Sequence, residues 1–266
     1  MDEPVYTNAF ISKVIAERKD DIIGLATSKG NRIKAKGKRV NFAYAVTLLI
    51  IMGIIGSFKV SLLIIDFKIR CRFSRFFLYI RSPSIIQTAK EAGIPAWEIE
   101  SVNNEAFIQE LKSLKPDIII NQAQEILSEK FISIPLKGVL NRHASLLPRN
   151  RGRLTPFWVL LNQEKETGVS IHFVTAEVDQ GDIIAQSRFP VDNNDNFLSL
   201  AQKGYDVAAD LMLQSLDEIE REVNILIYND PDKANYHSTP TLKDAMKYQL
   251  IMLKKTIKRG VNHIMT

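Results

Sequence analysis

The stretch GVLNRHASLLPRNRGRLTPFWVLLNQEKETGVSIHFVTAEVDQGDII, residues 138–184 of the 266, decides the fold class. Its first four residues, GVLN, are expected to form a strand that ends at Asn141. A helix is expected from Thr155, and 168–175 and 182–191 are β-rich segments on either side of the turn VDQG. Strand and helix in this order indicate an α/β protein.

The sequence on either side continues the alternation. DIIIN (117–121) is an apolar run without alternation, which is typical of a strand buried on both faces. Asn104 can cap the helix EAFIQELKSLK, whose apolar residues recur at helical spacing. Further helices are expected from Ser84 or Thr88 to Ala92, over 128–134, over 196–222 and over 241–258.

Alternating strands and helices predict a Rossmann-like α/β fold, with a mostly parallel sheet and helices on both of its faces. We expect residues 1–260 to form a single catalytic domain, followed by a tail of 261–266, without a barrel domain at the C-terminal end. In such sheets reactive groups gather where strands end at their carboxyl edge. The loop after Asn141 is therefore the place where chemistry is expected.

The N-terminal third departs from this pattern. A helix fits 7–18 and a strand fits 21–27, but a fold of this type begins with a strand, and only MDEPVY precedes the helix. That segment is too short and too polar for a buried strand of five or six apolar residues. We therefore expect the first strand to be missing, because the chain is truncated or its start codon is placed too late.

Residues 29–82 are expected to be an inserted basic and apolar helical segment. A basic run over 29–39 precedes seventeen uncharged residues, 42–58, at the lower end of the length of a membrane span. Helices are expected over 41–55 and 59–69. Three alternatives remain open for the apolar stretch. It can form a buried helical hairpin that turns near Gly56 and Ser57, it can lie on a membrane surface that residues 42–81 contact, or it can span the membrane.

Composition bounds the class of protein. Hydrophobic residues make up 45% and charged residues 24%, which is ordinary for a globular protein. The single cysteine, Cys71, excludes an internal disulfide and a cysteine-based zinc site, and favours a reducing, cytoplasmic setting. A net charge of +5 suits an anionic partner without selecting one.

Asn141, His143 and Asp179 are the candidate chemical residues. Asn141 and His143 are two residues apart in an extended segment, so their side chains share a face. Taken singly, Asn-x-His is more often a turn with a solvated histidine, and Asp-x-Gly is more often a plain β-turn. His172, on an apolar strand, is more readily a satisfied core histidine than a ligand.

Taken together, the ordered string resembles the formyltransferases that use 10-formyltetrahydrofolate. The shared pattern is Asn-x-His, then Ser-Leu-Leu-Pro (145–148), then Arg151-Gly152, then the distant Asp-x-Gly of 179–181. The resemblance is good over 84–190 and fainter over 196–245. One local departure is Asn150, where an aromatic residue often precedes Arg-Gly, and it bears on the acceptor side of the site.

The resemblance implies the fold above, a catalytic trio and a folate site. Asn141, His143 and Asp179 would be the catalytic residues. The partners implied are a folate formyl donor, 10-formyltetrahydrofolate, and an anionic amine acceptor such as methionyl-tRNA or an amino-sugar nucleotide. The cofactor-binding residues implied are Ala123, Glu125, Ile126, Leu127, Ser145 and Gly181.

The residue types suit this chemistry. Formyl transfer between nitrogens passes through a negatively charged tetrahedral intermediate, to which the Asn141 amide and a protonated His143 can donate. Asp179 can hold His143 charged or act as base through water. No metal is required. Two readings from other classes remain: an inactive binding or membrane-associated protein that keeps the fold, and a nucleic-acid-binding module based on the basic runs.

Overall fold

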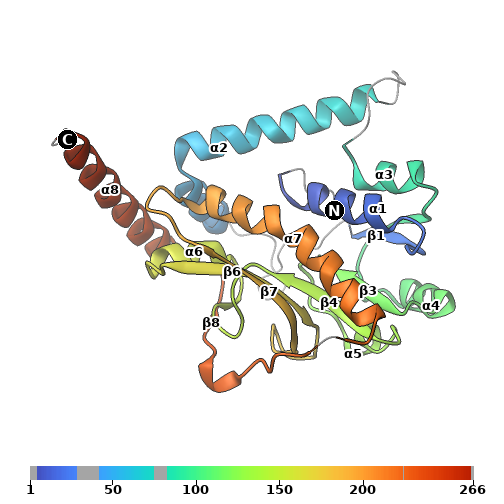
Figure 1. Cartoon of the computed structure of the whole chain (residues 1–266). Helices are drawn as coiled ribbons and strands as arrows, with labels where there is room; N and C mark the ends of the chain where they lie inside the picture. Colours follow the sequence, from blue (N-terminus) through green and yellow to red (C-terminus); the bar gives the residue numbers. More distant parts are fainter. Residues whose placement is uncertain (1–4, 29–41, 75–82, 224, 265–266) are drawn as a thin grey trace.

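The computed structural model describes residues 5–28, 42–74, 83–223 and 225–264, and the side chains up to residue 258 (Figure 1). The predicted basic run at 29–39 and residues 75–81 lie outside the described residues. The helices are α1 (Thr7–Arg18), α2 (Phe42–Phe73), α3 (Ile85–Glu91), α4 (Glu105–Leu114), α5 (Glu129–Ile132), α6 (Thr155–Leu161), α7 (Phe197–Glu220) and α8 (Leu242–Ile264). The strands are β1 (Leu25–Ser28), β2 (Ala96–Ile99), β3 (Ile118–Asn121), β4 (Gly138–His143), β5 (Arg151–Gly152), β6 (Glu166–Phe173), β7 (Ile183–Pro190) and β8 (Tyr236–His237).

The largest sheet has the strand order β3-β4-β6-β7. β3 and β4 are parallel, as predicted, but β6 runs antiparallel to β4, and β7 runs antiparallel to β6. The prediction of a mostly parallel sheet is therefore wrong for this part of the α/β fold. For the β6–β7 pair the reason is local: the two strands are joined directly by the turn around Asp179, and a direct turn of this kind reverses the chain.

The sheet is interrupted between β1 and β3. β1 pairs with β2 in parallel, and this pair forms a separate sheet from the one that starts at β3. Among the described residues, α1 comes first and no strand precedes it. The interruption falls where the sequence pattern leaves a strand missing, and its origin stays a prediction.

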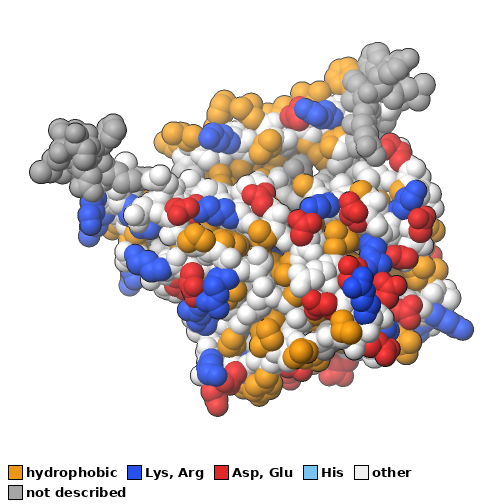
Figure 2. Space-filling model, in the orientation of Figure 1, with side chains coloured by type: hydrophobic (Ala, Val, Ile, Leu, Met, Phe, Trp, Pro, Cys, Tyr) orange, Lys and Arg blue, Asp and Glu red, His pale blue; other side chains and the backbone are white. Residues whose placement is uncertain are grey.

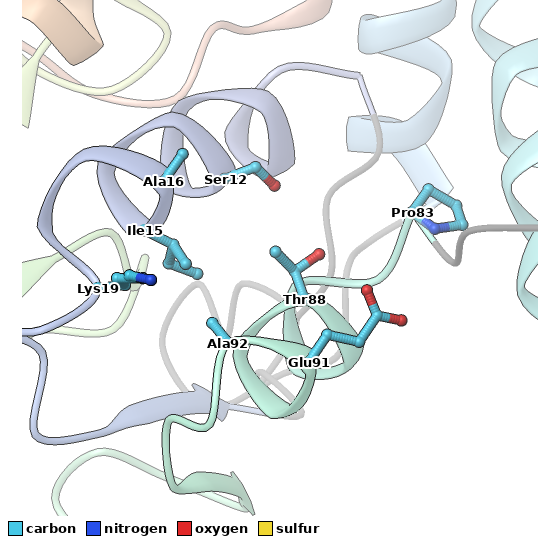
Figure 3. A pocket seen from close by; sticks show the side chains of 8 residues that line it. All are labelled: Ser12, Ile15, Ala16, Lys19, Pro83, Thr88, Glu91 and Ala92. Carbon is cyan, nitrogen blue, oxygen red and sulfur yellow. The ribbon is translucent and has the colours of Figure 1, made fainter.

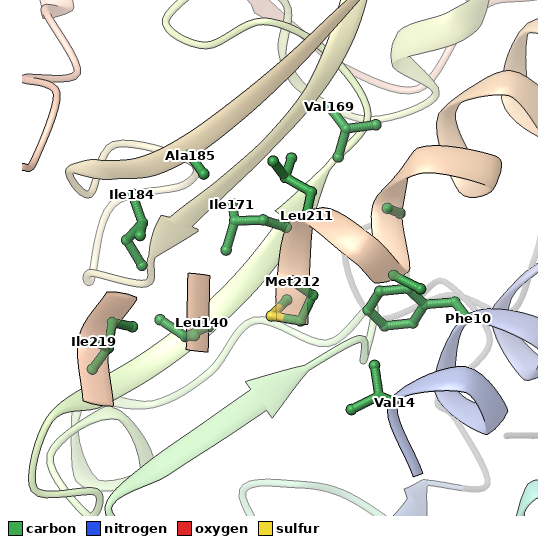
Figure 4. Packing of buried hydrophobic residues seen from close by; sticks show 12 residues of the cluster. Phe10, Val14, Leu140, Val169, Ile171, Ile184, Ala185, Leu211, Met212 and Ile219 are labelled. Carbon is green, nitrogen blue, oxygen red and sulfur yellow. The ribbon is translucent and has the colours of Figure 1, made fainter. Parts of the chain in front are cut away.

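Helices cover both faces of the four-stranded sheet, as predicted. On one face, α1 and α7 pack on β4, β6 and β7, with Phe10 and Met212 in contact with strand residues such as Leu140 and Ile171 (Figure 4). On the other face, α4 and α5 pack on β3 and β4. The Asn104 side chain accepts a hydrogen bond from Phe107 N and caps α4, as the sequence indicates.

The inserted segment forms α2, which is bent rather than folded into a hairpin. Gly53 has φ 67° and ψ 174°, so it divides the 32 residues into two helical arms. The bend lies three residues before the predicted turn at Gly56 and Ser57. Only Thr47 and Ile51 are buried, both on the first arm, so the prediction of a buried hairpin is wrong. Within the described part of the chain, α2 is also the helix whose length and apolar composition would suffice to cross a membrane.

Candidate active site

Strand β4 carries Asn141 and His143 into the middle of the four-stranded sheet. In the register of the strands, Asn141 lies beside Asn121 of β3 on one side and beside His172 of β6 on the other. β4 extends two residues beyond the predicted end and closes at His143. This placement brings three polar residues of different strands to one position in the sheet.

Asp179 completes the cluster from the turn between β6 and β7. Its Oδ2 is 3.5 Å from His143 Nδ1, and its Oδ1 is 3.7 Å from His172 Nε2. Oδ2 also accepts the backbone N–H of Gly152 at 2.8 Å. Asp179 has φ 54°, a left-handed conformation that few non-glycine residues adopt. The prediction that His143 and Asp179 meet is confirmed in geometry, and Asn141 joins them through His172; the catalytic roles of the three stay a prediction.

The His143 ring is buried and oriented by the loop that follows it. Its Nε2 is 2.8 Å from the Asn150 carbonyl oxygen, which can only accept, so Nε2 carries a proton. The other nitrogen, Nδ1, therefore faces Asp179. A separation of 3.5 Å is longer than a charge-assisted hydrogen bond, and such contacts tighten when substrate binds. A second proton on this ring would lie against the Asp179 carboxylate.

His172 is a buried core histidine, as the sequence favoured, but it also contacts the site. Its Nδ1 is 2.7 Å from the Phe173 carbonyl oxygen and so carries the ring proton. Nε2 is then an acceptor for Asn141 Nδ2, 3.3 Å away. Burial, together with the neighbouring His143, lowers the pKa of His172 to about 4. A neutral His172 thus fixes the direction in which the Asn141 amide points.

The depressed pKa of His172 predicts a loss of stability in acid. In the unfolded chain this ring takes up a proton as the pH falls through about 6.5. In the folded chain it stays neutral down to about 4. The unfolded state binds more protons between these values, so stability falls as the pH drops from 6.5 to 4, by on the order of 3 kcal/mol.

Urea unfolding at pH 7 and pH 4.5 measures this loss. His172→Gln is expected to show a smaller difference between the two pH values than the unchanged chain. His237→Gln is the comparison: burial lowers the pKa of that ring as well, but the ring is only half-buried, so a smaller effect in the same direction is expected. An identical pH dependence in His172→Gln and the unchanged chain would contradict the assignment.

Asn229 and Arg151 hold the Asp179 turn. Arg151 belongs to the Arg-Gly motif of the sequence, but Asn229 and its contact with Arg151 were not predicted. Asn229 is buried and donates from Nδ2 to the carbonyl oxygens of Asp179 and Gly181, both at 2.9 Å. Its own carbonyl and side-chain oxygens accept from Arg151 Nη2 at 3.0 and 2.7 Å. Arg151 is buried too, so its guanidinium braces this turn from within the protein. In the sequence, Asn229 is a single asparagine in the segment IYNDPD, and no motif or periodicity there marks it as a site residue.

Replacing Asn229 by alanine is expected to destabilise the fold by about 2–4 kcal/mol, because it removes partners from a buried guanidinium and from two buried carbonyls. Urea unfolding measures the change. Asn196→Ala removes the N-cap of α7, where the expected cost is about 1 kcal/mol. Equal losses in the two variants would show that Asn229 is an ordinary polar contact.

The segment YHSTPT, residues 236–241, lies next to the loop that follows β4. β8 pairs in parallel with β5, so Tyr236 and His237 lie beside Arg151 and Gly152. The His237 ring also stacks on Trp158 of α6, with ring centroids 4.5 Å apart. The faint similarity seen in this part of the sequence therefore belongs to the wall of the site.

The six residues predicted to bind a cofactor differ in their accessibility. Ile126 is exposed, and Ala123 and Glu125 are half-buried, whereas Leu127, Ser145 and Gly181 are buried. Glu125 accepts from Ser101 Oγ at 2.5 Å and from Val102 N at 3.1 Å, so its carboxylate orders the loop before α4. Ser145 Oγ donates to the Arg149 carbonyl at 2.9 Å within its own loop. Their roles toward a cofactor stay a prediction.

A separate cavity of about 510 Å³ lies between α1 and α3 (Figure 3). Its wall includes Ile15, Thr88 and Ala92, with Lys19 and Glu91 as the charged residues. None of the residues of the Asp179 cluster lines it. In the described ranges, no group of three His, Cys, Asp or Glu side chains is placed to hold a metal ion.

Comparison with known proteins assigns the family. The "Formyl transferase" family profile matches residues 79–216, just over half of the chain. The chain belongs to the formyl transferase family. It is similar to a methionyl-tRNA formyltransferase of Thermodesulfovibrio yellowstonii, 33% identical over 165 residues, which are 62% of this chain and 53% of that protein.

Two solved structures share the fold. Glycinamide ribonucleotide transformylase 1 from Symbiobacterium toebii matches with a TM-score of 0.51 and 19% identity, over 76% of this chain and 89% of that one. HypX from Aquifex aeolicus matches with a TM-score of 0.51 and 16% identity, over 62% of this chain and 31% of that one. The present chain spans about half the length of the curated relative it matches.

Proposed function

We propose that this formyl transferase moves a formyl group from 10-formyltetrahydrofolate to a primary amine. The observation that carries the proposal is that His143 and Asp179 face each other at 3.5 Å, while Asn141 joins them through His172, which is 3.3 Å from Asn141 and 3.7 Å from Asp179. Family membership supports the donor, and a HypX structure of this fold is described in complex with tetrahydrofolic acid.

In the mechanism we propose, the acceptor amine is itself the nucleophile. It attacks the formyl carbon, and negative charge develops on the formyl oxygen. The Asn141 amide donates to that oxygen from a direction set by neutral His172. Asp179, which faces His143 Nδ1, takes through water the proton that the attacking amine loses. As the tetrahedral intermediate collapses, the bond from the formyl carbon to the folate nitrogen breaks, and the His143–Asp179 pair gives a proton to that leaving nitrogen.

The acceptor we propose is an anionic amine, either methionyl-tRNA or an amino-sugar nucleotide. The relative named methionyl-tRNA formyltransferase supports the first. A basic chain suits either. Arg153, beside Gly152, lies close enough to lower the pKa of Tyr44 of α2, although burial outweighs this effect and raises that pKa overall. Its charge is therefore available next to the catalytic loop.

The test is formyl transfer with 10-formyltetrahydrofolate against a panel of amines that includes both acceptor classes. We expect folate-dependent formylation of one class. Folinic acid binding, followed by calorimetry, separates this proposal from the alternative of an inactive binding protein. If the chain binds no folinic acid and formylates no amine, the proposal is wrong. The intact trio of Asn141, His143 and Asp179 speaks against that alternative.

For location, we propose a cytoplasmic protein that lies at the periphery of a membrane. The single cysteine suits a reducing compartment. The exposed arm of α2 supports the membrane contact predicted from 42–81, of which the described residues are 42–74. Fractionation of cells that express the chain measures both parts of this proposal.

A further inference from the structure

The second arm of α2, residues 54–73, leaves the body of the protein and exposes its apolar side chains. Figure 2 shows hydrophobic side chains along the upper edge of the molecule, over α2. Ile54 is 90% exposed, and even Ile65, far along the arm, is 51% exposed. The large hydrophobic residues exposed on this arm are Ile54, Ile55, Phe58, Leu62, Leu63, Ile64, Ile65, Ile69 and Phe73.

The first arm of α2 is fixed to the protein. Ile51 is buried against α6, α7 and α8, and the Gln249 side chain of α8 donates to the Ile50 carbonyl. The bend at Gly53 then releases the second arm. Because the first arm packs against the protein, the exposed apolar side chains of α2 lie mainly after the bend.

Charged residues interrupt the second arm of α2 too often for it to span a bilayer. It contains Lys59, Asp66, Lys68, Arg70 and Arg72. Its longest uncharged run, 60–65, would cover about 9 Å at 1.5 Å per residue, against a hydrocarbon core of about 30 Å. Lysine and arginine can extend their charged ends to the headgroups while their stems stay in apolar surroundings. The arm therefore suits the interface of a membrane rather than its core.

Helix α8 presents a second apolar surface, independent of α2. Its buried side faces the protein through Ala245 and Tyr248. Five other side chains recur every three or four residues, so they share one face, and they are between 46% and 61% exposed. These five are Leu242, Met246, Leu250, Leu253 and Ile257. Figure 1 shows α8 and the second arm of α2 on the same upper side of the view, away from β8.

Cations border both apolar surfaces. On α8, the lysines at 243, 247, 254, 255 and 258 follow the apolar face around the helix, with Asp244 as the acidic residue of this stretch. On α2, four cations accompany Asp66, which pairs with Arg70 at 2.8 Å. A second copy of this chain on a two-fold axis would bring like charges together. Anionic lipid headgroups would complement them.

We propose that residues 54–73 of α2 and the exposed face of α8 form one surface that binds an anionic membrane interface. The apolar side chains enter the boundary between headgroups and acyl chains, while the lysines and arginines contact the headgroups. The first arm of α2 packs with Leu154 and α6, directly after the catalytic loop. Binding at this surface holds the site close to the lipid.

Sedimentation with vesicles tests the surface without reference to formyl transfer. The full chain is mixed with vesicles of phosphatidylcholine alone or of phosphatidylcholine and phosphatidylglycerol in equal parts. We expect binding to the second kind, weaker at high salt because the charges are screened. Phe58→Glu on α2 and Leu250→Glu on α8 are each expected to lower the partition coefficient about tenfold or more, since each removes an inserted apolar side chain.

Leu136→Glu is the matched control, because Leu136 is 81% exposed and lies on neither helix. It is expected to change the partition coefficient by less than about twofold, since it leaves the lipid-binding face intact. The double reversal Lys254→Glu and Lys258→Glu tests the electrostatic part and is expected to abolish the preference for phosphatidylglycerol. The proposal is overturned if the chain binds neither vesicle, binds both equally, or loses binding equally in the control. It is also overturned if the apolar surface instead closes a stable dimer in solution, dissociated by Phe58→Glu or Leu250→Glu.

Discussion

Replacing His143 by alanine is expected to lower the kcat of formyl transfer at least about a hundredfold. The substitution removes the ring that faces Asp179 and takes part in proton transfer to the leaving folate nitrogen. Proton transfer by a positioned side chain typically contributes a factor of about 10²–10⁴ in rate. Asn141→Ala and Asp179→Ala are expected to lose activity by at least about a hundredfold too, since each removes another part of the same arrangement.

Steady-state kinetics with saturating folate donor measures this loss, and urea unfolding checks that each variant is folded. Asp210→Ala is the control for removal of a carboxylate, because Asp210 is exposed on α7 and pairs with Lys13. Near-normal turnover in a folded His143→Ala would rule out the role assigned to this ring. If any one of the three variants retained its activity, the residue replaced in it would have no role in the mechanism.

Gly152→Ala is expected to damage both the fold and the site. Gly152 has φ 103°, and a Cβ added there would lie 2.1 Å from the His237 carbonyl oxygen. A left-handed conformation costs a non-glycine residue about 1–3 kcal/mol, and the overlap with the β8 backbone adds to it. Because Gly152 N donates to Asp179, any shift of the loop moves the carboxylate. A misplacement of about 1 Å can cost a hundredfold in rate.

Urea unfolding and formyl-transfer rates measure the two effects of Gly152→Ala. Gly93→Ala is the matched control, since Gly93 also has a positive φ, 79°, but open space around the added Cβ. The control carries the conformational strain without the overlap. If Gly152→Ala lost no more stability than Gly93→Ala and kept its activity, the close approach of β8 to the loop would be unimportant.

Asn141, His143 and Asp179 could be predicted from the sequence because each lies at the end of a predicted strand or in the turn that follows one. Asn141 and His143 share a face of an extended segment, and Asp179 sits in a turn with a recognisable composition. Asn229 could not be predicted in this way. It lies 50 positions beyond Asp179 and reaches that turn only through the packing of the segment after α7. A single asparagine far along the chain carries no periodicity that would mark it.

Most helices and strands could be predicted from the sequence, but the relative direction of the strands and the position of the bend in α2 could not. The caps and apolar periods of α4 and α7 mark these helices in the sequence. Strand direction is not encoded in the composition of β6, so the antiparallel part of the sheet was missed. The bend of α2 depends on the left-handed backbone of Gly53, and the nearby Gly56 and Ser57 offered equally good positions for a turn.

The interruption of the sheet gives α1 a mechanical importance that its length does not suggest. With no strand pairing described between β1 and β3, side chains of α1 link the two parts of the fold. Phe10 and Val14 belong to the cluster over the large sheet, Ile15 belongs to the cluster around β1 and α3, and Ile11 touches both. Cooperativity of unfolding between the two lobes is then transmitted through side-chain packing, that of α1 and that of Ile99 of β2 against the cluster of α4, β3 and β4, rather than through a backbone ladder. The lobe of β1 and β2 can open as a local unit while the sheet that carries Asn141 and His143 stays closed.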